Sequence, residues 1–155
     1  MDNASKNADS VQVHAGHRAR QRQRFLESGD FRGFADHNVL EMLLFYSIPR
    51  RDTNELAHAL INRFGSLQRV FEASYEDLLK VDGISENSAC LIKMVLPLYR
   101  RYAENCFKEK KTFADRNEII EYLKSLYAGM AHEEVNMMCF DLKMKFISQT
   151  VLGIG

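Results

Sequence analysis

The sequence predicts a mainly helical first region, residues 16–107, followed by the incomplete start of a small α+β domain, residues 113–155. Two observations support this prediction. Up to about residue 107, apolar residues recur at helical spacing in segments separated by glycine or proline. After about residue 130 the spacing changes to that of extended chain. The first dozen residues are polar and lack a hydrophobic stretch, so we expect a disordered tail over residues 1–15.

Composition excludes several classes of protein. The 155 residues carry 21 basic and 21 acidic side chains, so net charge gives no argument for a polyanionic partner. The three cysteines are odd in number and form no Cys-x-x-Cys pair, which argues against a zinc knuckle or redox dithiol and favours free thiols. No apolar run approaches the roughly 20 residues that span a bilayer, and no signal peptide is recognisable. We therefore expect a cytoplasmic protein without a membrane partner.

The first helical segments are separated by short breaks. One begins at Gly16, and a second, from Asp36, is apolar almost all round, so we expect it to be a buried core helix. A third, residues 54–64, keeps apolar positions at spacings of three, four and seven. Asp52-Thr53 can cap its start, and the following glycine ends it.

Three further helices are predicted before residue 107. Residues 66–72 form a short one, and a capping-box-like sequence at Ser74 starts another. A longer helix follows from about residue 85 to 105. Pro97 lies inside it and should kink or split it near Leu96, because proline lacks the N–H that a helix interior requires.

The sequence of the last part of the chain predicts one helix and two strands. The helix covers residues 118–127, and residues 135–140 form a short, mostly apolar run that suggests a strand buried on both faces. A turn at residues 142–144 leads to a second strand, residues 145–152. A lone hairpin is marginal in water, so we expect these strands to open a domain whose remainder is absent. Exposed edges should make them the least stable part of the chain.

A motif with chemical meaning joins two of the helices. Lys80-Val81-Asp82-Gly83-Ile84-Ser85 has the form of a helix-hairpin-helix turn, in which glycine lets the backbone approach a phosphodiester strand. Amide groups at the start of the second helix would then bind phosphate, helped by Lys80 and Lys93. The second glycine of such turns is Ser85 here. The candidate DNA-binding residues are Lys80, Gly83, Ile84, Ser85 and Lys93; the alternative is a hairpin that only packs.

Clustered arginines give a second, weaker indication of phosphate binding. Arg18, Arg20, Arg22 and Arg24 alternate along the first helix, and Arg50-Arg51 lie at a turn. At this spacing the four side chains spread around the helix instead of forming one stripe. A solvated helix and a phosphate-contacting arm both remain open. No aromatic residue alternates with the arginines, which argues against a groove for single strands.

His132-Glu133-Glu134 stands immediately before the first predicted strand. A carboxylate at such a boundary can act as a general base, although it is more often a solvated loop charge. The five histidines show no paired metal-ligand spacing such as His-Glu-x-x-His, and the sequence has no glycine-rich phosphate loop. We therefore predict no metal site in this chain.

Several segments together resemble one bacterial family. They are Gly16-His17-Arg18 through Phe25-Leu26, the run from Glu41 to Thr53 that contains Phe-Tyr-x-Ile-Pro-Arg-x-Asp-Thr, the run Arg63 to Leu67, and Leu79 to Ile84. In this order they look like the N-terminal half of RadC, the UPF0758 family named for DNA repair. The resemblance covers about residues 16–155 and implies a helix-hairpin-helix region followed by a JAB/MPN-type domain.

In RadC-like proteins that second domain resembles the JAMM zinc metallopeptidases, so the resemblance implies zinc as a cofactor and hydrolysis as the reaction. The ligands lie in a His-x-His-Pro-x-Gly segment and a following Ser-x-x-Asp, and neither is in this sequence. The family's glutamate, which acts on the metal-bound water, corresponds to Glu133, with Glu134 as the fallback. Where the family tends to have Gly-Thr, this chain has Gly153-Ile154-Gly155.

The resemblance leaves three functions open. The full protein could be a zinc-dependent hydrolase, in which case the 155-residue chain itself should bind no zinc and be inactive. The helical region could bind DNA through its phosphates, without sequence preference. It could instead be a protein-interaction module whose hairpin is purely structural.

Overall fold

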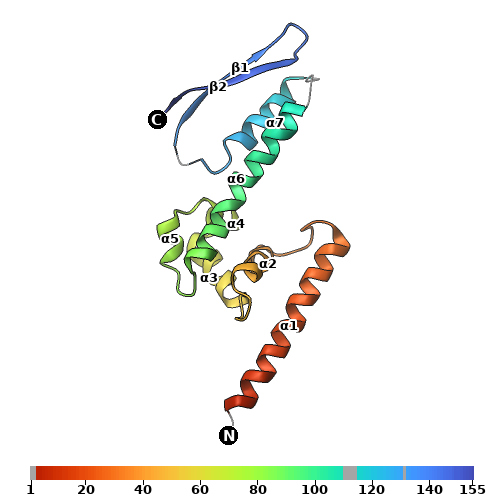
Figure 1. The fold of residues 1–155 in the computed structure, drawn as a ribbon, viewed down its shortest axis with the longest axis vertical. Helices are drawn as coiled ribbons and strands as arrows, with labels where there is room; N and C mark the ends of the chain where they lie inside the picture. Colours follow the sequence, from red (N-terminus) through yellow and green to blue (C-terminus); the bar gives the residue numbers. More distant parts are fainter. Residues whose placement is uncertain (1–2, 110–114, 131) are drawn as a thin grey trace. The chain divides into compact units, whose positions relative to one another are not determined.

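The computed structural model describes the backbone of residues 3–109, 115–130 and 132–155, and the side chains of these from residue 16 on. It is mostly helical, as predicted, with one two-stranded sheet (Figure 1). The chain divides into two compact units, residues 1–92 and 93–155, which are described separately. The elements are α1 Asn3–Ser28, α2 Asp36–Ser47, α3 Asn54–Phe64, α4 Leu67–Glu72, α5 Tyr75–Leu79, α6 Glu86–Glu109, α7 Arg116–Leu126, β1 Glu134–Phe140 and β2 Phe146–Ile154.

Helix α1 begins earlier than the sequence predicted. The expected disordered tail was residues 1–15, whereas the structure carries the helix back to Asn3. No glycine or proline interrupts residues 3–15, so nothing in the backbone chemistry ends the helix before Gly16.

The core of the first unit forms around α2. Leu40 and Leu44 are completely buried, which confirms the predicted core helix. Further buried side chains come from α3, α4, α5, the α5–α6 connection and the start of α6: Ala57, Leu60, Val70, Leu78, Val81, Ile84, Ala89 and Ile92. Helices α3, α4 and α5 have only 11, 6 and 5 residues, so tertiary burial rather than helix length stabilises them.

Local signals set the ends of these short helices largely as predicted. Gly65 follows α3 with a φ of 92°, a left-handed conformation that glycine adopts without strain. Ser74 caps α5 by accepting a hydrogen bond from the Asp77 N–H at 3.0 Å. At α3 the cap differs in detail: Asp52 Oδ1 accepts from the Asn54 N–H at 2.9 Å, while the Thr53 hydroxyl makes no capping bond.

Helix α6 is continuous from Glu86 to Glu109, with Pro97 in its interior. The sequence predicted a kink or a split near Leu96; the split is wrong, and the kink stays a prediction. A proline interior to a helix costs about 3 kcal/mol, which burial of the same helix at Ile92 and at Phe107 offsets. The two units meet within α6, between residues 92 and 93, whereas the sequence suggested a boundary at residues 107–113.

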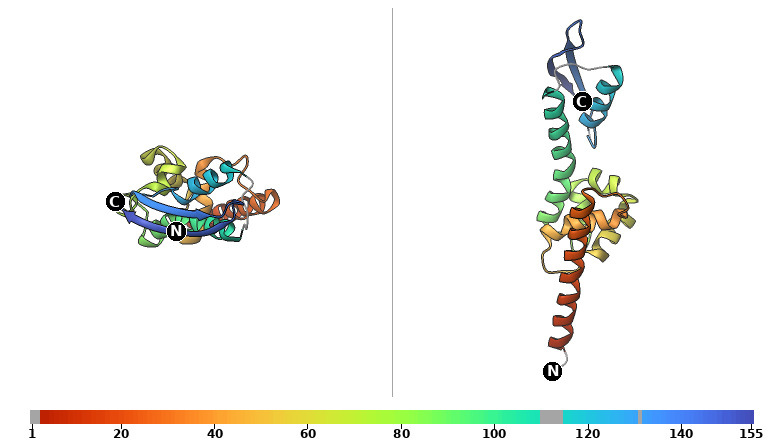
Figure 2. Two further views of the ribbon diagram at one scale, coloured as in Figure 1. Left: turned by 90° about the horizontal axis from the view of Figure 1, so that it is seen from above. Right: turned by 90° about the vertical axis from the view of Figure 1, so that its right-hand side faces the viewer.

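The second unit comprises the rest of α6, α7 and an antiparallel β hairpin. Figure 2 shows the two strands running side by side in both views. Asp115 caps α7 through the N–H groups of residues 117 and 118, as a capping box predicts. The small core consists of Phe107 stacked on Tyr122 at 3.7 Å, with Ile119, Leu126, Met138, Phe140 and Phe146 packed against it.

Strand β1 is covered on one face, whereas the sequence suggested burial on both. Asn136 and Met138 are half-buried, and the intervening Val135 and Met137 are 60% and 46% exposed. The apolar run was short and lacked polar alternation, so its periodicity could not reveal that one face lies open.

Within the described residues, no helix is long and apolar enough to cross a membrane.

Candidate functional site

The predicted hairpin turn is tightly built around Gly83. Val81 N–H donates to Leu78 O and Ile84 N–H donates to Val81 O, both at 3.1 Å. Gly83 has a φ of 90°, which a residue with a Cβ adopts only under strain. Ile84 is buried in the core, so its side chain anchors the turn and is not available to a ligand.

Ser85 caps α6 at the position where such turns usually have a second glycine. Its hydroxyl oxygen lies 3.3 Å from the Ser88 N–H, from which it accepts, and 3.1 Å from the Ser88 hydroxyl. Ser85 itself is exposed. The serine therefore preserves the helix start, and its hydroxyl is already engaged in the cap.

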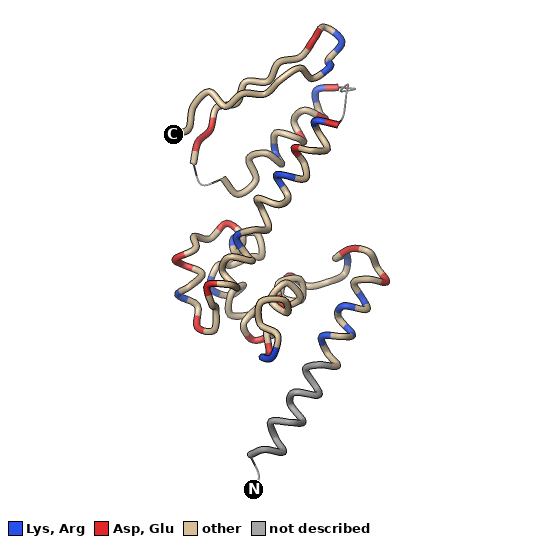
Figure 3. Tube along the Cα trace, in the orientation of Figure 1, with Lys and Arg blue, Asp and Glu red and all other residues tan. Residues whose placement is uncertain are grey.

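The charges around this turn are mixed. Lys80 Nζ donates to Asp77 Oδ1 at 2.7 Å, and this bond, with that from Ser74, lowers the pKa of the Asp77 carboxyl. Asp82 and Glu86 are exposed beside the turn, and Figure 3 shows acidic residues along this segment. A cleft of about 320 Å³ next to the turn is lined by Ile48, Arg51, Asp52, Glu55, Leu56, Ala59, Asp82 and Gly83. The surroundings of the turn are thus more acidic than a phosphate-binding surface requires.

Four of the five predicted DNA-binding residues lie together in this turn. Lys80, Gly83, Ile84 and Ser85 all belong to the α5–α6 connection. Lys93 is half-buried in α6 and belongs to the second unit.

Arg18 has a role that the arginine pattern did not reveal. Its guanidinium donates to the backbone carbonyls of Ile48 at 2.7 Å, Pro49 at 3.0 Å and Phe45 at 3.4 Å, and also to that of Arg51. The guanidinium carbon lies 4.7 Å from the centre of the Phe45 ring. Arg18 therefore fastens α1 to the loop between α2 and α3, and we call this set of contacts the Arg18 clamp.

A buried carboxylate completes the clamp region. Glu41 is 1% exposed, and its oxygens lie 3.0 Å from His17 Nε2 and 3.4 Å from Asn54 Nδ2. Burial lowers the pKa of the Arg18 guanidinium, while the Glu41 charge opposes that shift. The sequence signal was the co-occurrence of Gly-His-Arg with Ile-Pro-Arg-x-Asp-Thr, and the two motifs form opposite sides of the clamp.

Arg24 is also structural: it donates to Gly33 O at 2.7 Å and stacks over Phe34 at 4.0 Å. Arg20 and Arg22 are exposed on the same helix, as are Arg50 and Arg51 in the loop. The four arginines of α1 therefore differ in role: Arg18 and Arg24 donate to backbone carbonyls of later segments, whereas Arg20 and Arg22 are exposed on the helix.

The two candidate glutamates differ in exposure and in the hydrogen bonds that they make. Glu133 is exposed, and its backbone carbonyl accepts from the Gly155 N–H at 2.8 Å, which closes the open end of the β ladder. The side chain of Glu134 is 11% exposed. It accepts a hydrogen bond from Asn136 Nδ2 at 2.7 Å, and His132 Nε2 lies 3.8 Å from its Oε2. The geometry leaves the Glu133 carboxylate available to solvent and ties Glu134 to its neighbours.

A UPF0758 protein of Fusobacterium nucleatum subsp. nucleatum is 38% identical over 133 residues, which cover 81% of this chain and 56% of that relative. The chain belongs to the UPF0758 family. This confirms the resemblance to RadC noted from the motifs. The chain spans about half the length of that UPF0758 relative. No family profile matches the sequence, and no solved structure matches it.

The described side chains of this UPF0758 chain were compared with the requirements of a zinc site. Within residues 16–109, 115–130 and 132–155, no three histidine, cysteine, aspartate or glutamate side chains gather closely enough to hold a metal ion. Glu133 and Glu134, the two candidates for the catalytic glutamate, both lie within the described residues, and the catalytic role stays a prediction.

Proposed function

We propose that this UPF0758 chain forms the N-terminal part of a JAMM-type zinc hydrolase and supplies Glu133 as its general base. Family membership supports the proposal, and the position of Glu133 immediately before β1 is the observation that carries it. A general base must reach the proton that it removes, and the exposed carboxylate of Glu133 is free to do so.

The contacts of the neighbouring glutamate support the choice of Glu133. Glu134 already accepts a hydrogen bond from Asn136, and its side chain lies on the covered side of the hairpin. Moving it toward a substrate would break that bond. The proposal requires the zinc ligands to come from outside this sequence, and we derive no step through the metal.

A matched pair of substitutions tests this assignment in the full-length protein. Glu133→Gln should abolish hydrolysis of a pool of fluorogenic peptides and leave zinc content unchanged, since a positioned general base contributes about 100- to 10,000-fold. Glu134→Gln should retain most activity. Equal activity of wild type and Glu133→Gln, or absence of zinc from the purified protein, would overturn the proposal.

A second function, phosphate binding by the hairpin, is favoured by one observation: Gly83 adopts the positive φ that brings a turn backbone close to a ligand. This reading keeps Lys80, Gly83, Ser85 and Lys93 as contacts and accounts for the family's link to DNA repair. The nearby acids predict weak binding, without sequence preference and steeply dependent on salt.

Duplex DNA titrated at low salt tests this second function. Lys80→Glu with Lys93→Glu should remove the binding, whereas Asp82→Asn should strengthen it by removing repulsion at the turn. Unchanged affinity in the double variant would leave the hairpin a structural element and favour a protein-interaction role for the helical region. The three free cysteines agree with the cytoplasmic location that we propose for either function.

A further inference from the structure

Exposed arginines gather where α1 meets the loop between α2 and α3, inside the first unit. Residues 16–26 carry four arginines and no acidic residue, and Figure 3 shows basic positions on the described part of α1 and in this loop. We call the three exposed residues Arg20, Arg22 and Arg50 the basic surface. Arg51 is not included, because it lines the cleft beside the hairpin turn together with three acidic residues.

The Arg18 clamp holds the two parts of the basic surface next to each other. Arg18 donates to the backbone carbonyls of Pro49 and Arg51. These residues are the two neighbours of Arg50 in the loop. Burial lowers the pKa of the Arg18 guanidinium, and the charge of Arg22 lowers it further, so Arg22 lies within electrostatic range of the clamp. The contacts of the clamp therefore join the arginines of α1 and of the loop in one surface.

The positive charges of the basic surface are not neutralised within the described part of the chain. None of its three arginines forms an ion pair or a side-chain hydrogen bond with another described residue. The two acids whose charges act on Arg18 are already engaged: Glu41 is buried and hydrogen-bonded, and Asp52 caps α3. Like charges one helical turn apart repel each other, so a bound anion would stabilise this surface.

The chemistry of the basic surface favours one class of anion. Guanidinium groups bind phosphate oxygens in a bidentate manner. An anionic membrane is disfavoured, because lipid-binding helices carry an apolar face and residues 16–24 contain no large apolar side chain. No aromatic residue alternates with the arginines, as a site for single strands would require. An α-helix fits the major groove of B-form DNA, whereas that of A-form RNA is too deep and narrow.

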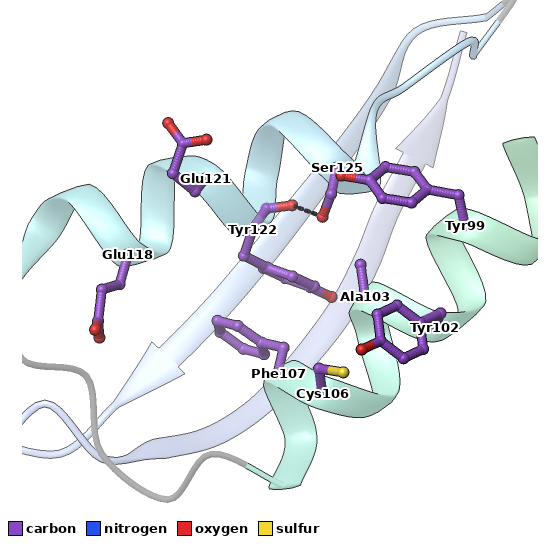
Figure 4. A pocket seen from close by; sticks show the side chains of 9 residues that line it. All are labelled: Tyr99, Tyr102, Ala103, Cys106, Phe107, Glu118, Glu121, Tyr122 and Ser125. Carbon is purple, nitrogen blue, oxygen red and sulfur yellow. Dashed lines mark hydrogen bonds between the residues drawn. The ribbon is translucent and has the colours of Figure 1, made fainter. Parts of the chain in front are cut away.

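Two other surfaces suit phosphate less well. At the hairpin turn, Lys80 is paired with Asp77 at 2.7 Å, and further exposed acids flank the turn. In the second unit, a groove of about 310 Å³ between α6 and α7, drawn in Figure 4, is lined by aromatic rings with Glu118 and Glu121. Its lining in the described part of the chain includes no lysine or arginine. Carboxylates repel phosphate at both places.

We propose that the basic surface binds the phosphate backbone of duplex DNA. Such contacts carry no sequence information, so the affinity should be independent of sequence and should fall steeply with salt. Arg18 acts as a positioning residue, because its guanidinium is used to hold the loop. The proposal rests neither on hydrolysis nor on phosphate binding by the hairpin turn.

Fluorescence anisotropy with the 155-residue chain tests the proposal. The probe is a short fluorescein-labelled DNA duplex, and the comparisons are an RNA duplex, a single-stranded DNA of the same sequence and vesicles that contain phosphatidylserine. We expect the DNA duplex to bind most tightly, with log K falling linearly with the logarithm of the salt concentration. Equal or tighter binding of any comparison ligand would overturn the proposal.

Charge-removing variants locate the contact. Arg20→Gln combined with Arg22→Gln should weaken binding by roughly tenfold or more and lower the salt slope by about two, since each lost phosphate contact removes about 0.9. Arg50→Gln should lower the slope by about one. The control combines Arg63→Gln with Arg69→Gln, which remove the same charge from exposed positions of α3 and α4 and should leave the slope unchanged. Circular dichroism verifies that each variant folds. An equal loss in the control would show that net charge alone causes binding, and would overturn the proposal.

A lysine variant distinguishes the basic surface from the hairpin turn. If Lys80→Glu with Lys93→Glu removes DNA binding while Arg20→Gln with Arg22→Gln leaves it unchanged, the hairpin turn is the contact and the basic surface is not. Loss of binding and of salt slope in the arginine variant supports the basic surface, whatever the lysine variant does.

Discussion

The two units of the chain bury their apolar residues very differently. In the first, ten buried hydrophobic residues from α2 to α6 form one core. In the second, the buried core is Phe107 with Tyr122, supported by half-buried neighbours. Most of the large, exposed apolar side chains of the described residues also lie in the second unit, including Leu98, Tyr102 and Ile147.

This difference predicts that the two units contribute unequally to stability. Burial of apolar surface is the main favourable term in folding, so the first unit should carry most of the chain's stability. The second unit has a smaller buried core and a strand, β1, with one exposed face. Equilibrium hydrogen exchange should report greater protection in α2 and α3 than in β1 and β2.

The largest expected effect comes from the core of the first unit. Leu60 is completely buried, and Leu60→Ala should lower the free energy of unfolding by about 2–5 kcal/mol. The matched change Leu152→Ala, at a residue 60% exposed in β2, should lower the free energy of unfolding by less than about 0.5 kcal/mol. Urea titration followed by circular dichroism measures both. Similar losses for the two variants would contradict the proposed division of stability.

The next largest effect should come from the Arg18 clamp. Arg18→Ala leaves the carbonyls of Phe45, Ile48 and Pro49 without their shared donor, and hydrogen bonds to charged groups contribute about 1.5–3 kcal/mol. We expect a loss of that order in urea titration. Arg22→Ala, at an exposed arginine one turn further along α1, should leave stability within about 0.5 kcal/mol. Amide hydrogen exchange in the α2–α3 loop should become faster in Arg18→Ala but not in Arg22→Ala.

The clamp also shows what the sequence could and could not predict. Features that depend on local sequence were predicted correctly: the cap at Ser74, the glycine after α3 and the apolar α2. Contacts between distant segments were not. Nothing in the spacing of four arginines distinguishes Arg18, which reaches a loop about thirty residues away, from its exposed neighbours.

The second unit also contains features that depend on tertiary packing and that the sequence alone could not predict. An apolar run of six residues fits a strand, but whether one face or both are covered depends on which elements pack against it. The continuity of α6 through Pro97 likewise depends on packing at both ends of the helix. For the site, the resemblance pointed to Glu133 with Glu134 as the fallback, while the structure distinguishes the two carboxylates by exposure and by the hydrogen bond from Asn136 to Glu134.

A smaller effect is expected at the hairpin turn of the first unit. Gly83→Ala places a Cβ on a residue with a φ of 90°, which should cost about 1 kcal/mol through backbone strain. The nearest atoms are those of Leu56 at 3.6 Å, so steric overlap adds little. Gly153→Ala in the second unit, where φ is not positive and no atom lies within 4 Å, should be close to neutral. A lower urea midpoint for Gly153→Ala, with no change for Gly83→Ala, would contradict this prediction.

The smallest expected effect concerns the ion pair beside that turn. The hydrogen bond from Lys80 is the main cause that lowers the pKa of Asp77. Because the folded-state pKa is depressed, the pair contributes its stability above the unfolded pKa and loses it as the pH falls through the folded value. Lys80→Met should raise the Asp77 pKa toward its ordinary value in an NMR titration. Lys124→Met, which removes a similar pair from the second unit, should leave Asp77 unchanged. If Asp77 titrates identically in wild type and Lys80→Met, Lys80 is not held by this pair and is fully available to a ligand at the turn.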